Sequence, residues 1–134
     1  MVSSRKILLT TSRNPTSRIR TFCNDLTSVI PGIVRVNRGK MSTNEVAEKA
    51  LEHGADRVVI VDRWQGGPGK IEFFLIGTGG LVPAPLVLYI AGIRLQREFE
   101  NSRFTPTRSL AITLATKGNE KVTEVASSLS KFLN

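Results

Sequence analysis

The alternation of apolar and polar positions predicts strands followed by helices along this chain. Lys6–Thr10 is mostly apolar, as is typical of a buried strand, and Asn14-Pro15 is then expected to open a helix. Apolar residues of that helix recur at i, i+3, i+4 and i+7 and so share one face: Ile19, Phe22, Cys23 and Leu26. The chain is therefore predicted to begin with a strand, a polar turn and a helix.

A second helix is predicted between Ser42 and Gly54. Ser42 and Glu45 have the spacing of a capping box, Glu45 and Lys49 form a charge pair at i, i+4, and Gly54 is a typical helix stop. The face expected to be buried consists of Val46, Ala47, Ala50 and Leu51.

Other apolar runs predict further strands. Val58–Val61 is uninterrupted, which is typical of a strand covered on both faces. Ile33–Asn37 alternates instead, so that Arg35 is expected to face solvent. Three more strands are expected, at Lys70–Ile76, Leu86–Ile90 and Leu110–Ala115.

Glycine-rich and mixed-charge stretches separate these runs. Gln65–Gly69 is expected to be a turn, Gly77–Gly80 a loop, and Arg94–Arg108 an exposed loop. A third helix is expected to close the chain after Asn119. Its predicted buried stripe consists of Val122, Val125, Ala126, Leu129 and Phe132.

These elements predict an α/β fold, a layered mixed sheet with helices in one compact domain that spans residues 1–134. Ile7–Leu26 and Leu110–Leu129 each have an apolar strand, a hydroxyl-rich turn with one base, an asparagine and a helix. Two similar strand-turn-helix halves would explain this correspondence. Chance is the alternative, because the unit is common in α/β proteins.

Charge is distributed unevenly along the 134 residues. The formal net charge is +8, and residues 1–40 hold eight Lys or Arg against one acid, Asp25. No apolar stretch is long enough to span a membrane, and one cysteine with one histidine gives neither an internal disulfide nor a zinc site. We therefore expect a cytoplasmic protein that needs no metal or other cofactor, has no membrane partner and binds a polyanion.

Motifs for nucleotide binding and catalysis are incomplete. The glycine-rich run before Lys70 lacks the first glycine and the hydroxyl residue of a P-loop, because Trp64 and Ile71 occupy those positions. His53 is the single imidazole and lies at a predicted helix end. No enzymatic activity is therefore expected.

The candidate ligand contacts are basic residues near the polar turn that follows the first strand. A helix N-terminus attracts anions, but Arg18 and Arg20 diverge by roughly 160° around the helix and cannot hold one phosphate together. Residues spread over turn, helix and strand end suit a long RNA backbone better than a small anion. These residues are Arg13, Arg18, Arg20, Arg35, Arg38 and Lys40.

The segment Leu8–Phe22, with its Thr-Thr-Ser-Arg turn, resembles the opening of the Brix domain. Similar matches occur at Ile30–Gly32, Val36–Gly39 and Gly54–Val61. One departure is Gly79–Pro85, where the family often has a Gly-Pro-Thr segment. The short length is similar to that of stand-alone archaeal members.

The resemblance implies two similar α/β halves and a non-catalytic role in ribosome biogenesis, in pre-rRNA processing or small-subunit assembly. The implied partners are ribosomal precursor RNA or a small guide RNA, together with ribosome-assembly proteins. Two other hypotheses stay open. One is a nucleotide-dependent enzyme, and the other is a protein-interaction module without direct RNA binding, whose docking face would consist of Phe73, Phe74, Leu86 and Leu88.

Overall fold

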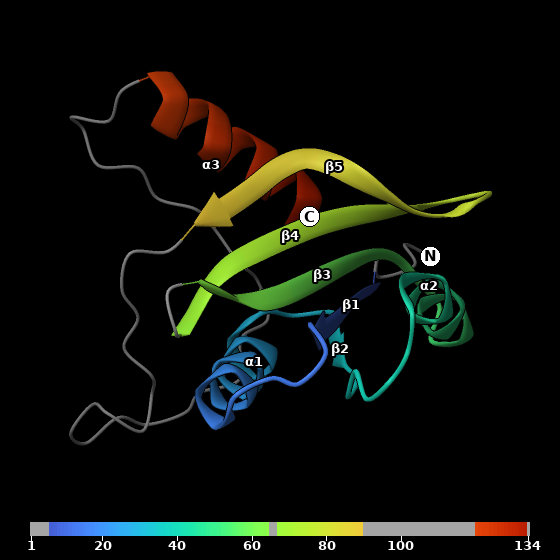
Figure 1. Ribbon diagram of the computed structural model, residues 1–134. Helices are drawn as coiled ribbons and strands as arrows, with labels where there is room; N and C mark the ends of the chain where they lie inside the picture. Colours follow the sequence, from blue (N-terminus) through green and yellow to red (C-terminus); the bar gives the residue numbers. More distant parts are fainter. Residues whose placement is uncertain (1–5, 65–66, 90–119, 134) are drawn as a thin grey trace.

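A five-stranded mixed sheet organises the residues that the computed structural model describes, 6–64, 67–89 and 120–133 (Figure 1). The strands lie in the order β2-β1-β3-β4-β5. Their bounds are β1 Lys6–Thr11, β2 Ile33–Arg35, β3 Ala55–Trp64, β4 Gly67–Gly77 and β5 Gly80–Tyr89. The helices are α1 Ser17–Val29, α2 Thr43–Glu52 and α3 Glu120–Leu133. The α/β class and the mixed sheet are thus confirmed.

The sheet is parallel on one side and antiparallel on the other. β1 pairs in parallel with β2 and with β3, whereas β3, β4 and β5 are antiparallel. The crossover through α1 moves outward from β1 to β2, and the crossover through α2 returns past β1 to β3. Because both crossovers are expected to be right-handed, they place α1 and α2 on opposite faces of the sheet.

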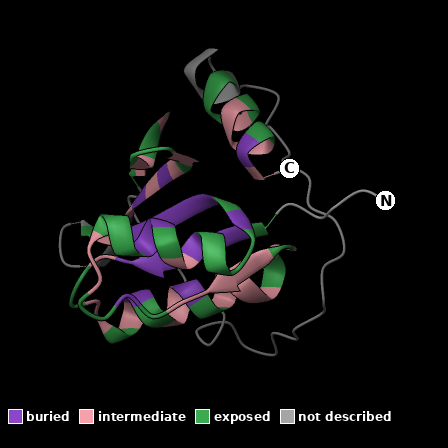
Figure 2. Cartoon of the chain, turned by 90° about the vertical axis from the view of Figure 1, so that its right-hand side faces the viewer, coloured by how far each residue is buried: buried purple, intermediate pink, exposed green. Residues whose placement is uncertain are grey.

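Each face of the sheet carries its own apolar core, which Figure 2 shows as the buried interior between helices and strands. On the first face, Ile19 and Cys23 of α1 pack with Ile7 and Leu9, and Phe132 of α3 joins them. On the second face, α2 packs on β1 and β3, through Val46, Ala50, Leu8, Val58 and Ile60. The uninterrupted apolar run of β3 is buried on both faces, as predicted.

The first helix begins later than Asn14-Pro15, contrary to the prediction. Thr16 is the N-cap, and its hydroxyl accepts a hydrogen bond from the Ile19 amide at 3.2 Å. Asn14 has φ +58°, a left-handed conformation that asparagine tolerates better than most residues. This backbone reversal turns the chain between β1 and the helix, so the first helical turn starts at Ser17.

The second helix has the predicted capping box and stop but a narrower buried face. Ser42 and Glu45 cap each other's backbone amides, and Gly54 has φ +73°. Leu51 is 62% exposed, so its predicted burial is wrong. At about 100° per residue, Leu51 lies on the flank of the stripe that Val46 and Ala50 define.

Strands β4 and β5 are longer than predicted. β4 includes Gly67–Gly69, where the sequence predicts a turn. β5 includes residues 80–85 of the Gly79–Pro85 segment. The two prolines of that segment are tolerated because β5 lies at the sheet edge, where missing ladder donors cost least. Thr78 and Gly79 form the tight turn between the strands.

The docking face predicted for a protein-interaction module is not exposed as one patch. Phe73 and Leu86 are buried in the first core, and Leu88 packs against it. Phe74 packs against the second core. Successive strand residues point to opposite faces of the sheet, and helices cover both faces here, so these four side chains cannot form one exposed patch.

Helix α3 agrees with the predicted closing helix over the side chains that are described. Phe132 is buried and Leu129 packs against the first core, but Val125 is 38% exposed, so its predicted burial is wrong. The predicted strand Leu110–Ala115, the loop Arg94–Arg108 and most of the second proposed half lie outside the described residues. The two similar halves and the single domain of residues 1–134 stay predictions.

Arg57 is a buried cation in β3 with incomplete hydrogen bonding. It is 4% exposed, its Nε–H donates to Asp56 Oδ1 at 3.2 Å, and its guanidinium carbon lies 5.5 Å from the centre of the Phe132 ring. Among the described residues, its terminal nitrogens Nη1 and Nη2 have no hydrogen-bond partner. Desolvation of an incompletely paired charge opposes folding.

We therefore expect Arg57→Met to raise the free energy of unfolding by about 1 kcal/mol, because methionine removes the charge and keeps much of the apolar volume. Arg57→Ala is the matched control and should lower it, because alanine leaves a cavity. Urea denaturation measures both. A loss of stability as large in Arg57→Met as in Arg57→Ala would contradict this account.

Candidate nucleic-acid interface

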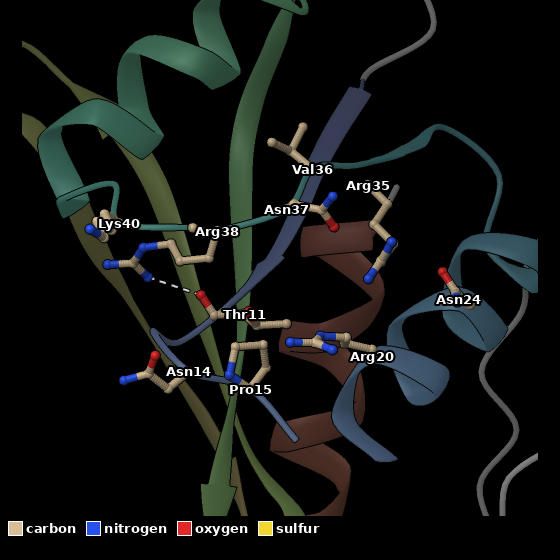
Figure 3. Close-up of a pocket in the computed structure, with 11 residues that line it drawn as sticks. Thr11, Asn14, Pro15, Arg20, Asn24, Arg35, Val36, Asn37, Arg38 and Lys40 are labelled. Carbon is tan, nitrogen blue, oxygen red and sulfur yellow. Dashed lines mark hydrogen bonds between the residues drawn. The ribbon is translucent and has the colours of Figure 1, made fainter. Parts of the chain in front are cut away.

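A cavity of about 690 Å³ opens beside the ends of β1 and β2 (Figure 3). Among the described residues, it is lined by the end of β1 and the turn after it, by one flank of α1, and by the end of β2 and the loop after it. The lining residues are Thr11, Asn14, Pro15, Arg20, Asn24, Arg35, Val36, Asn37, Arg38, Gly39 and Lys40. Four of the six predicted contacts are therefore brought together: Arg20, Arg35, Arg38 and Lys40.

The strand topology explains this position. The chain leaves β1 toward α1, and it leaves β2 toward α2 on the opposite face. Connections that diverge from neighbouring parallel strands leave a crevice outside their carboxyl ends, which is where open α/β sheets bind ligands. Here that crevice is edged by cations.

Arg38 joins the two segments that form the crevice. It is 8% exposed, its Nη1 donates to the Thr11 carbonyl at 3.0 Å, and its Nε donates to the Met41 carbonyl at 2.7 Å. The bond to Met41 lies within the loop after β2, and the bond to Thr11 connects that loop with β1. The Thr10 hydroxyl connects them as well, because it donates to the Val36 carbonyl at 2.8 Å. Arg38 thus supports the shape of the cavity as well as lining it.

Electrostatics around Arg38 agree with a basic cavity. Burial lowers the pKa of Arg38, and the positive charge of Arg13 lowers it further, while Asp62 partly offsets both. Arg13 is exposed and its Nε donates to the Met41 carbonyl at 3.4 Å, so its side chain lies beside Arg38 rather than along the cavity lining.

Arg35 differs from its predicted solvent-facing position. It is half-buried, because β2 alternates and Arg35 points to the same face as Ile33, the face that α1 covers. Its guanidinium lies beside Cys23 of α1. Burial raises the pKa of the Cys23 thiol to about 11, and the charge of Arg35 and its hydrogen bond to the thiol offset part of that rise.

The remaining two arginines separate as helical geometry requires. Arg20 is exposed and lines the cavity, whereas Arg18 is half-buried and lies outside it. The expected divergence of Arg18 and Arg20 around α1 agrees with this difference. Arg18 and Arg13 stay predicted contacts of a longer RNA path.

Three asparagines in the cavity were missed by the sequence reasoning. Asn14, Asn24 and Asn37 are all exposed and come from the turn, from α1 and from the loop after β2. Charge concentration indicated only the basic residues. Asn14 and Asn37 come just after two parallel strands, and this position in the sequence could have indicated that their amides lie at the same edge of the sheet.

Neither a cluster of metal ligands nor a helix able to span a membrane is found in residues 6–64, 67–89 and 120–133. Within those ranges, no group of three His, Cys, Asp or Glu side chains could hold a metal ion. No helix there is long and apolar enough to cross a membrane.

Comparisons with known proteins give relatives of one kind. No family model matches the chain. A probable Brix domain-containing ribosomal biogenesis protein of Aeropyrum pernix is 43% identical over 91 residues, which cover 67% of this chain and 50% of that protein. One of the same description from Methanopyrus kandleri is 32% identical over 130 residues, covering 96% of this chain and 67% of that protein.

A solved structure agrees with these relatives. The crystal structure of a probable ribosomal biogenesis protein from Aeropyrum pernix superposes with a TM-score of 0.79 at 31% identity, over 96% of this chain and 72% of that one. The chain spans about half the length of several curated relatives that it matches, the Aeropyrum pernix protein among them.

Arg38 provides a test of the crevice architecture. We expect Arg38→Met to lower the free energy of unfolding by about 1–3 kcal/mol, because the Thr11 carbonyl loses its charged donor and the Met41 carbonyl keeps only the longer bond from Arg13. Lys40→Met is the matched control at an exposed position of the same loop and should change stability by less than about 0.5 kcal/mol. Thermal and urea unfolding measure both variants. Equal losses of stability in Arg38→Met and Lys40→Met would contradict a structural role for Arg38.

Proposed function

Because the chain belongs to the Brix-domain ribosomal biogenesis proteins, we propose that it binds RNA during ribosome assembly through the basic cavity at the ends of β1 and β2. The proposed RNA is ribosomal precursor RNA or a small guide RNA. The proposal has no catalytic step, and it includes the cytoplasmic location expected from the sequence. Ribosome-assembly proteins are proposed as further partners.

The observation that carries this proposal is the gathering of cations at one edge of the sheet. Arg20, Arg35, Arg38 and Lys40 reach the same cavity from a helix, a strand and a loop. Surface charges that serve only solubility are not expected to gather around one crevice, here the crevice between the chain segments that leave β1 and β2. Convergence favours a polyanionic ligand.

The roles of these cations differ. Arg38 is buried and committed to two backbone carbonyls, so it contributes positive potential and shape. Arg20 and Lys40 are exposed and are the most direct candidates for phosphate contacts. Arg35 lies between these extremes, half-buried beside Cys23.

The hydrogen bonding of the loop after β2 also supports RNA binding at the cavity. Hydrogen bonds tie the loop after β2 to β1 at three points, including the Val36 amide to the Leu9 carbonyl at 3.0 Å. A loop held in this way keeps its cationic side chains in place before the ligand arrives. Less conformational entropy is then lost on binding.

The test is RNA affinity as a function of salt. For single-stranded RNA, the logarithm of the binding constant should fall by about 0.7 for each phosphate contact per tenfold rise in salt. We expect Arg20→Gln and Lys40→Gln each to weaken binding and to reduce that slope by about 0.7. Fluorescence anisotropy of labelled ribosomal RNA fragments gives both quantities.

Lys131→Gln is the matched control, since it removes the same charge from an exposed position of α3 outside the cavity. It should leave the slope unchanged. A slope near zero for the unaltered protein would contradict RNA binding, and an equal loss in Lys131→Gln would contradict the assignment to this cavity.

A further inference from the structure

We propose that the cavity beside β1 and β2 receives one unstacked nucleotide, so that the protein selects single-stranded RNA and contacts a base as well as the backbone. The inference rests on the proposed RNA binding and names the part of the RNA that this site recognises. It is carried by the size of the cavity, by its asparagines and by the arrangement of its cations.

The cavity is too large for a phosphate group alone. Its volume of about 690 Å³ falls in the range of about 300–1,000 Å³ that is usual for pockets holding small organic ligands. A bound phosphate would leave most of this space to water. A base with its sugar would fill much more of it.

The chemistry of the lining also exceeds what a phosphate needs. Asn14, Asn24 and Asn37 each present an amide with donors and an acceptor, and no hydrogen bond of these amides to the described residues is found. A phosphate accepts hydrogen bonds but cannot donate to a carbonyl oxygen. A base edge does both, and side-chain amides pair with base edges in one plane.

The positions of these groups fit a nucleotide between its two phosphates. Figure 3 shows Arg20, Asn24 and Arg35 on one side of the cavity, and Arg38 and Lys40 on the other, with Asn37, Thr11 and Pro15 between them. A nucleotide within a strand has a phosphate on either side of its sugar. Cations at both ends, with the Asn37 amide between them, match that order.

Apolar surface for the base comes from Pro15 and Val36, and from the planes of the guanidinium groups. Among the described residues, no Phe, Tyr or Trp lines the cavity, so stacking there would use Arg20 or Arg35, as guanidinium planes do in RNA recognition. A duplex cannot use this site, because its bases are stacked inside and the major groove of A-form RNA is too narrow for side chains.

The experiment uses a seven-nucleotide RNA with 2-aminopurine at its centre and adenosines on both sides, alone and annealed to its complement. Stacked neighbours quench 2-aminopurine, so entry of that base into the cavity should raise its fluorescence. We expect the single strand to bind at least about tenfold more tightly than the duplex, in keeping with about 1–3 kcal/mol for one recognised base.

Variants separate base contacts from backbone contacts. Asn24→Ala and Asn37→Ala should each weaken single-strand binding about fivefold or more and abolish the fluorescence rise, while the salt slope stays unchanged. Both residues are exposed, so the fold should persist, as circular dichroism can check. Asn44→Ala, at an exposed asparagine of α2 outside the cavity, is the matched control and should behave like the unaltered protein.

Failure of this inference differs from failure of RNA binding itself. Salt-dependent binding with equal affinity for duplex and single strand, or with 2-aminopurine still quenched, would overturn the nucleotide site and leave the proposed function standing. Binding to neither RNA at low salt would overturn both.

Discussion

The hydrogen bonds that Arg38 donates to the carbonyls of Thr11 and Met41 are the constraint on which the candidate site depends. The first carbonyl ends β1, and the second lies just before the cap of α2. One buried guanidinium therefore sets how closely the loop after β2 approaches the end of β1. Among the described residues, the other bonds between these two walls are those of the Thr10 hydroxyl and the Val36 amide and a longer bond from Arg13 to the Met41 carbonyl.

This constraint connects topology with charge. Two crossovers that diverge from β1 and β2 create the crevice, and the same crossovers bring basic residues that are far apart in sequence to its rim. Arg20 follows the first strand and Lys40 follows the second. Parallel pairing of β1 and β2 fixes where the two connections begin, and the hydrogen bonds of Arg38 hold the loop that carries Lys40.

The strand and helix order could be predicted from the sequence because apolar periodicity reports which side chains are buried. The same reasoning failed where tertiary position decides. The side chains of β2 alternate as predicted, but α1 covers the face to which Arg35 points. Phe73 and Leu86 are buried because α3 packs on their face of the sheet. Composition also cannot reveal that Arg38 is committed to backbone carbonyls or that three exposed asparagines converge, since both depend on how the loops are placed.

The most direct measurement of the central claim is a map of RNA contacts on the folded protein. Titration of isotope-labelled protein with a single-stranded ribosomal RNA fragment, followed by amide chemical shifts, gives that map. The account predicts the largest changes in residues 11–24 and 35–41, with little change in α3. Changes concentrated on β4, β5 and α3, or no change at RNA concentrations that saturate binding, would contradict it.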